Sequence, residues 1–196
     1  MSKNRFDLSG KIALITGGSR VLGREMALAF AEAGADVAIA SRKLVSCEAT
    51  AKDIEAFGVR AFPVAAHVGY WDQCDALIDA VYGHFGRIDI LVNNAGLSPL
   101  YPSLAEIEES LYDKVFDINL KGPFRLATQI GTRMAKGDGG SIINVSSTAS
   151  FLMLVAELPF TACSASVTSR TTWVGSAMET GVVSCQVIST SSDSRT

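Results

Sequence analysis

The sequence has few of the residues that build metal sites or disulfide frameworks. It has only two histidines, and its four cysteines, Cys47, Cys74, Cys163 and Cys185, lie far apart and form no CxxC pair. Zinc sites need closely spaced cysteine and histidine ligands, so we assign no metal. Reduced thiols in the cytoplasm are the simplest interpretation of isolated cysteines.

The sequence also lacks long apolar runs and clusters of one charge. No uninterrupted apolar stretch approaches the roughly 18 residues of a membrane span, and no apolar signal core follows the first seven residues. The net charge is -3 and no basic run of five or more residues occurs. We therefore expect neither nucleic acid nor membrane as a partner. The 196 residues, 48% of them hydrophobic, fit one soluble globular domain.

Apolar runs typical of strands alternate with segments of helical periodicity. This alternation favours a parallel sheet with helices on both faces. The expected strands are Lys11 to Thr16, Asp36 to Ser41, Arg60 to Ala66, Ile88 to Asn93 and Ser141 to Ser146. The expected helices are Arg24 to Gly34, Ser46 to Phe57, Trp71 to Phe85 and Leu111 to Met134, the last with a kink at Pro123.

The composition changes after Phe160. Residues 161–196 contain sixteen Ser or Thr and no Leu, Lys, Tyr or Asn, whereas the first 160 residues contain sixteen Leu. A helix over Ser166 to Met178 and a short strand over Val182 to Ile188 fit the pattern there, and the last seven residues are expected to fray.

A glycine-rich turn follows the first expected strand and leads into the first expected helix. Backbone N–H groups and the positive end of a helix dipole can bind a pyrophosphate at such a turn. Glycine is needed where a Cβ would meet the ligand or where φ is positive. By itself the pattern is weak, because glycine turns join many strands to helices.

Four motifs in order strengthen this interpretation. Thr16-Gly17-x-x-x-Val21-x-Gly23 resembles the TGxxxGxG signature of the short-chain dehydrogenase/reductase family. Asn93-Asn94-Ala95-Gly96 is similar to the NNAG motif of that family. Asn119 falls where the family has a catalytic asparagine. Gly140 to Ser147 resembles the strand that ends in the catalytic serine, here Ser147. The similarity is good over residues 8–160 and poor beyond them.

The resemblance implies one α/β domain over residues 1–196. Its fold would be a doubly wound parallel sheet of the Rossmann type with three α/β/α layers, lacking the last strand and helix of the family. It implies an NAD(P)(H)-dependent oxidoreductase that transfers a hydride between nicotinamide and a small-molecule carbonyl or secondary alcohol. Members of the family are commonly homo-dimers or homo-tetramers.

The resemblance also assigns the residues that would bind the cofactor. They are Gly17, Ser19, Arg20, Leu22, Gly23, Ser41, Arg42, His67, Val68, Asn94, Ala95 and Gly96. An acid after the second strand would bind a ribose 2′-hydroxyl, but Ser41, Arg42 and Lys43 stand there, which favours NADP(H) over NAD(H). Alternatively, Arg42 and Lys43 are solvated turn residues. His67 lies where the family has an aspartate near the adenine and is equally consistent with a surface histidine.

The sequence departs from the family at the proton-transfer residues. Phe160 stands at the spacing of the catalytic tyrosine and Ser164 at that of the catalytic lysine. No Tyr follows Tyr112 and no Lys follows Lys136, so shifting the alignment restores neither. General acid–base catalysis is typically worth 10²–10⁴ in rate, so we expect turnover to be severely reduced.

Val21 replaces the middle glycine of the loop, and its stiff β-branched side chain should crowd the cofactor. Together with the altered tail, these departures suggest a family member altered or truncated at the C-terminus, by a frameshift, alternative splicing or a shortened gene copy. Three functions remain open: an NADP(H)-dependent oxidoreductase, a non-catalytic cofactor-binding or interaction protein, and a product without a stable fold.

Overall fold

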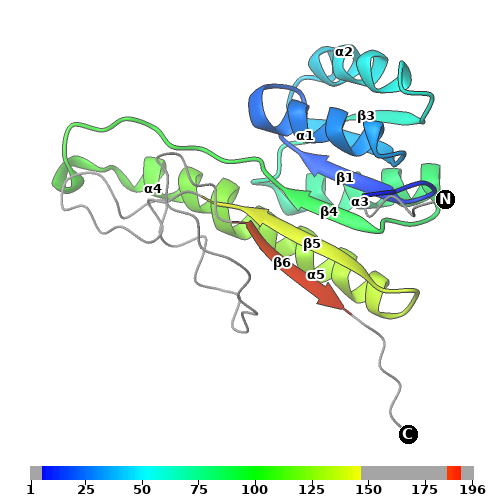
Figure 1. The fold of residues 1–196 in the computed structure, drawn as a ribbon. Helices are drawn as coiled ribbons and strands as arrows, with labels where there is room; N and C mark the ends of the chain where they lie inside the picture. The colour runs from blue at the N-terminus through cyan, green and yellow to red at the C-terminus, as the bar shows by residue number, and fades with distance from the viewer. Residues whose placement is uncertain (1–5, 147–184, 191–196) are drawn as a thin grey trace, which may run out of the picture.

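Five parallel strands form the centre of the fold, and a sixth joins one edge in the opposite direction (Figure 1). The computed structural model describes residues 6–146 and 185–190. The strand order is β3-β2-β1-β4-β5-β6, so the direction of winding reverses between β1 and β4. The strands are β1 (Ile12–Thr16), β2 (Asp36–Ser41), β3 (Ala61–Ala65), β4 (Ile90–Asn93), β5 (Gly140–Val145) and β6 (Cys185–Thr190).

Helices cover both faces of the sheet and confirm the predicted three-layer doubly wound arrangement. Helices α1 and α2 pack on one face, and α3 and α5 pack on the other (Figure 1). The helical segments are α1 (Val21–Glu32), α2 (Leu44–Glu55), α3 (Trp71–Phe85), η1 (Leu104–Glu106), α4 (Glu109–Phe116), η2 (Asp117–Lys121) and α5 (Gly122–Ala135).

Alternation along the strands divides the apolar core in two. In β1, Ala13 and Ile15 face α1 and α2, whereas Leu14 faces α3 and α5. Because successive strand side chains point to opposite faces, a strand buried on both sides reads as a continuous apolar run. All five residues of β1 are buried, which explains why this strand could be predicted from the sequence.

The long helix predicted over Leu111 to Met134 consists of three segments. A π turn, η2, separates α4 from α5, and the Gly122 N–H donates to the Asp117 carbonyl five residues earlier. Pro123 has no N–H to donate to the Asn119 carbonyl, so the ordinary helical ladder is interrupted at this position. The predicted kink at Pro123 is therefore realised as a π turn that ends just before the proline.

The two edges of the sheet differ. Strand β3 is one edge, and the Ala66 N–H just beyond it donates to the Ser41 carbonyl of β2 at 2.9 Å. Since strand N–H groups alternate in direction, Pro63 occupies a position whose nitrogen faces away from β2. At the other edge, β6 overlaps the short strand predicted over Val182 to Ile188, and it pairs antiparallel with β5.

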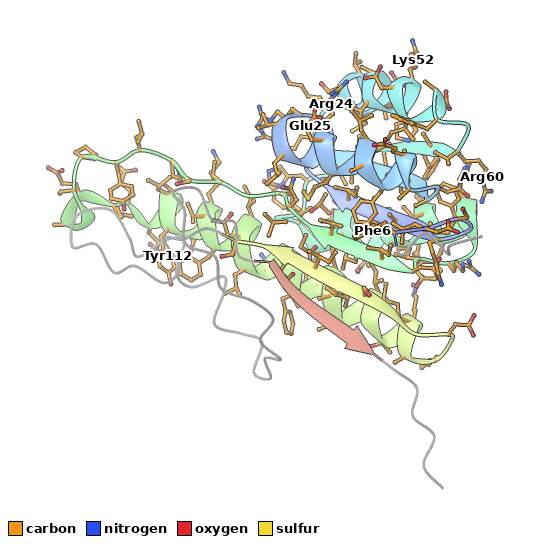
Figure 2. The ribbon with its side chains drawn as sticks, viewed as in Figure 1. Phe6, Arg24, Glu25, Lys52, Arg60 and Tyr112 are labelled. Carbon is orange, nitrogen blue, oxygen red and sulfur yellow. The ribbon has the colours of Figure 1, made fainter. Side chains whose placement is uncertain are left out.

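Ion pairs join elements that are distant in the sequence. Arg125 of α5 donates to both carboxylate oxygens of Asp75 on α3, at 2.8 and 2.6 Å, and its guanidinium lies 4.7 Å from the centre of the Trp71 ring. Arg24 at the start of α1 (Figure 2) reaches Asp53 of α2 at 2.8 Å. These contacts link the two helices within each layer.

Most predicted elements lie within a few residues of their observed bounds, and those of β2 and α3 agree at both ends. Helix α1 begins three residues earlier than predicted. The helix predicted over Ser166 to Met178 lies outside the described residues. Within the described ranges, no helix is both long and apolar enough to cross a membrane.

Candidate functional site

A cleft of about 480 Å³ opens at the carboxyl ends of β1, β2 and β4. Ligands of open α/β sheets bind in this place, where the winding reverses. All twelve residues predicted to bind the cofactor line it: Gly17, Ser19, Arg20, Leu22, Gly23, Ser41, Arg42, His67, Val68, Asn94, Ala95 and Gly96. Seven further residues complete the lining: Val21, Ala40, Lys43, Ser46, Ala66, Leu97 and Ile118.

The turn after β1 requires glycine at two positions. Gly17 has a φ of +65°, which residues with a side chain rarely adopt. At Gly23 a Cβ would overlap the Gly17 carbonyl oxygen and would lie 2.5 Å from the Asn94 side-chain nitrogen. The first turn of α1 therefore packs directly on the loop, with no room for a side chain between them at Gly23.

A network of hydrogen bonds fixes the glycine loop to the end of β4. The Thr16 hydroxyl accepts the backbone N–H groups of Asn94 and Ala95, at 3.0 and 3.1 Å. The Asn94 amide donates in return to the carbonyls of Thr16 and Gly17, at 3.0 and 3.3 Å. Asn94 thus positions the loop from behind, which gives a structural reason for an asparagine in the predicted NNAG-like motif.

The first turn of α1 lines the cleft, and no side chain among the described residues caps it. Its N-cap residue, Arg20, makes no side-chain capping bond, and no acid occupies the first turn. Val21, the first residue of the helix, has a φ of +46° and a side chain that is 80% exposed. A β-branched residue is a genuine outlier in this region, so the loop is strained at this point.

Three cationic residues line the cleft, two directly after β2 and one at the start of α1. Arg20, Arg42 and Lys43 are exposed at the rim of the cleft, and none of them forms a salt bridge within the described part of the chain. Among the described residues that line the cleft, none is acidic. This end of the cleft is therefore suited to an anion.

Ser41 lies at the base of this cationic group and contacts a buried thiol. Its hydroxyl oxygen is 3.1 Å from Cys47 Sγ and 3.4 Å from the Lys43 carbonyl oxygen. Cys47 Sγ is also 3.6 Å from the Val64 carbonyl oxygen. Burial raises the pKa of the Cys47 thiol. The thiol proton is therefore retained at neutral pH.

His67 and Val68 form the wall after β3. The Gly69 N–H donates to His67 Nδ1 at 3.2 Å, and the His67 N–H donates to Gln73 Oε1 at 2.8 Å. The His67 ring also packs 4.8 Å from the Tyr70 ring. His67 is thus a half-buried residue of the cleft wall.

Asn119 lies in the π turn and supports the floor of the cleft. Its Oδ1 accepts the Leu97 N–H and its Nδ2 donates to the Leu97 carbonyl, both at 2.8 Å. This pair fixes the segment that follows the NNAG-like motif. Of the four residues predicted at catalytic positions, only Asn119 is described; Ser147, Phe160 and Ser164 lie outside the described residues.

Cys47 was not predicted as part of the site. It is buried behind the cleft and contacts Ser41. A cysteine at a helical core position gives no signal beyond its apolar spacing. Ile118, which lies in the π turn, was also missed as a lining residue.

Comparison with known proteins identifies relatives over most of the chain. Residues 11–192 match the family profile described as short chain dehydrogenase. A short-chain type dehydrogenase/reductase of Picea abies is 36% identical over 84% of this chain and 64% of its own length. A 3-oxoacyl-acyl-carrier-protein reductase of Staphylococcus epidermidis is 40% identical over 70% of this chain and 56% of its own.

Solved structures give the same result. A short-chain type dehydrogenase/reductase from Mycobacterium marinum is 35% identical with a TM-score of 0.76, over 81% of this chain and 63% of that one. L-sorbose reductase from Gluconobacter frateurii, solved with NADPH and L-sorbose, is 30% identical with a TM-score of 0.77, over 82% and 61%. The chain thus spans somewhat less than two thirds of the length of these relatives.

Proposed function

The chain belongs to the short chain dehydrogenase family, and from this premise we propose that its cleft binds NADP(H) in preference to NAD(H). The observation that carries the proposal is the cationic end of the cleft. Arg42 and Lys43 follow β2, Arg20 precedes α1, all three line the cleft, and no described lining residue is acidic. A 2′-phosphate is a dianion that needs such cations, whereas a carboxylate there would repel it.

The glycine loop supports the same ligand at the pyrophosphate. Among the described residues the first N–H groups of α1 have no side-chain cap, and the absence of a Cβ at Gly17 and Gly23 lets the loop pack closely against Asn94. An anion at this point would accept the free N–H groups and meet the positive end of the helix dipole. Val21 opposes binding, because its exposed side chain lines the same cleft.

The remaining cofactor contacts are proposed along the cleft wall. His67 and Val68 would lie beside the base, and Asn94, Ala95 and Gly96 beside the nicotinamide half. The cofactor would supply a hydride to a carbonyl carbon, or accept one from a secondary alcohol. Asn119 would keep the Leu97 segment in place beneath the reacting groups.

We further propose that this chain binds the cofactor but turns over slowly. A tyrosine acting as acid or base near neutrality must have its pKa lowered from about 10, which a nearby lysine would do. Phe160 has no proton to donate and Ser164 carries no charge. Ser147 alone would then hydrogen-bond the substrate oxygen without supplying a proton of suitable acidity.

A second candidate function follows from the same two residues. A chain that keeps the cofactor cleft without Tyr and Lys at these positions suits a non-catalytic cofactor-binding or interaction protein. In either case we propose a small carbonyl or alcohol as the ancestral substrate, and assembly into a homo-dimer or homo-tetramer as in the family.

Titration of the purified chain with NADPH and NADH tests these proposals, using nicotinamide fluorescence and the thermal unfolding temperature. Tighter binding of NADPH is expected, together with little oxidation of NADPH on a panel of carbonyl compounds. The double variant Phe160→Tyr, Ser164→Lys should raise turnover. Equal affinity for the two cofactors would contradict the NADP(H) preference, and rapid turnover by the unaltered chain would contradict the proposed impairment.

A further inference from the structure

Ser41 lies where the ribose of a bound dinucleotide would be recognised, so the direction of its single hydroxyl proton matters. A 2′-phosphate needs hydrogen-bond donors, whereas a ribose 2′-hydroxyl is also satisfied by an acceptor. A serine hydroxyl can do either, depending on which groups it contacts on its inner side. In this chain the nearest inner group is a thiol, 3.1 Å away.

The surroundings of that thiol limit what it can do. Cys47 is fully buried on α2 and contacts two oxygens, Ser41 Oγ at 3.1 Å and the Val64 carbonyl at 3.6 Å. Val64 lies in β3, which is already paired with β2. The Val64 carbonyl already accepts a hydrogen bond in the strand ladder. The Ser41 oxygen is closer to the thiol and has only weak partners, so it is the better acceptor for the thiol proton.

We propose that Cys47 is a positioning residue for cofactor selectivity: its S–H donates to Ser41 Oγ, so that the Ser41 O–H points into the cleft as a donor to the 2′-phosphate. The Lys43 carbonyl, at 3.4 Å, is the only other acceptor for this hydroxyl that the described contacts show. A hydroxyl that accepts one hydrogen bond is polarised and becomes a better donor in the next. The inference rests on the proposed cofactor cleft. It assigns a role in cofactor selectivity to Cys47, which does not line the cleft.

The test measures dissociation constants of the full chain for NADPH and NADH in the wild type and in six variants. In Cys47→Ala the affinity for NADPH should fall about two- to tenfold, the usual range for losing one hydrogen bond, while that for NADH stays within about twofold. Cys47→Ser keeps a donor at the same place and should restore the NADPH preference. Cys47→Val provides a second apolar variant of larger volume if the alanine variant does not fold.

Two controls separate positioning from loss of stability. Cys74 is an equally buried thiol that contacts the Val68 carbonyl at 3.2 Å and is not in contact with Ser41, so Cys74→Ala should leave the ratio of the two affinities unchanged. In a Ser41→Ala background, Cys47→Ala should have no further effect on that ratio, because the thiol acts only through the hydroxyl.

The outcomes distinguish this inference from the proposed function. If the wild-type chain binds neither dinucleotide, the cofactor cleft itself is refuted and the inference falls with it. If it binds both and Cys47→Ala weakens them equally, changes neither, or acts undiminished without Ser41, the positioning role alone is overturned. A selective loss of NADH affinity would show that Ser41 faces the cleft as an acceptor, which also overturns it.

Discussion

Replacement of Val21 by glycine should stabilise the protein, although it removes an apolar side chain. Val21 has a φ of +46° at the first position of α1, where glycine would be unstrained. Its side chain is 80% exposed, so its removal uncovers little buried apolar surface. The dominant change is therefore relief of backbone strain in the folded state.

The magnitude follows from two opposing effects. A residue held in a sparsely populated backbone region costs about 1–3 kcal/mol. The greater freedom of glycine in the unfolded chain offsets this by about 0.5–1 kcal/mol. The expected net gain for Val21→Gly is about 1 kcal/mol in the free energy of unfolding, or about 2–4 °C in the midpoint of thermal unfolding for a chain of this size.

Urea unfolding of the free protein measures this gain, with the slope m unchanged between variants. Val45→Gly is the matched control, because Val45 is 77% exposed in the first turn of α2 and has no positive φ. It should lose roughly 0.5 kcal/mol, because glycine is about 1 kcal/mol and valine about 0.5 kcal/mol less favourable than alanine in a helix. If Val21→Gly is destabilised as much as Val45→Gly, the strain at Val21 is not real and the reasoning fails.

The same variant should also bind the dinucleotide more tightly. Val21 lines the cleft, so its removal frees space next to the N–H groups of the first helical turn. Fluorescence titration with NADPH should show a lower dissociation constant for Val21→Gly and no change for Val45→Gly. Unchanged affinity would mean that the valine side chain lies clear of the ligand.

Three further outcomes are expected. Gly122→Ala should cost about 1–3 kcal/mol in urea unfolding, because its Cβ would overlap the Val68 carbonyl oxygen. Gly83→Ala should be neutral or stabilising, because no atom of the described residues outside its own helix lies within 4 Å of the position of its Cβ. Burial raises the pKa of the Cys74 thiol to about 11, so the free energy of unfolding should fall as the pH rises from about 9 towards 11, and less so in Cys74→Ala, since the unfolded chain loses this proton first. Asn119→Leu and Asn119→Asp should both destabilise the protein, because Leu makes neither backbone hydrogen bond and Asp would turn an acceptor towards the Leu97 carbonyl; unchanged stability in both variants would show that the amide clamp is unimportant.

The sequence was most informative where local pattern and tertiary burial agree. Strand β2 is an apolar run bounded by polar residues, and α3 places its apolar residues at helical spacing, so both could be delimited closely. The start of α1 was misplaced because Val21 begins the helix with a backbone conformation that no valine pattern indicates. The direction of β6 depends on pairing with β5, which local sequence does not specify.

The candidate site was predictable as a list of residues but not as an arrangement. The twelve predicted cofactor residues share one cleft because the carboxyl ends of parallel strands meet at one edge of the sheet. The supporting contacts depend on distances across the fold. Thr16 meets Asn94 across 78 positions of sequence, and Cys47 reaches Ser41 only once α2 has packed against the sheet.

The proline in β3 has a consequence for how copies of this protein can associate. An exposed sheet edge is a template on which a strand from another molecule can add, and this is a common route to fibrous aggregation. Pro63 removes one of the outward N–H donors at the middle of that edge. A strand from another molecule would find no N–H donor at Pro63, and the proline ring would obstruct its approach to β3. Replacing Pro63 would therefore open a surface for sheet extension in concentrated solution, even where the stability of the single chain hardly changed.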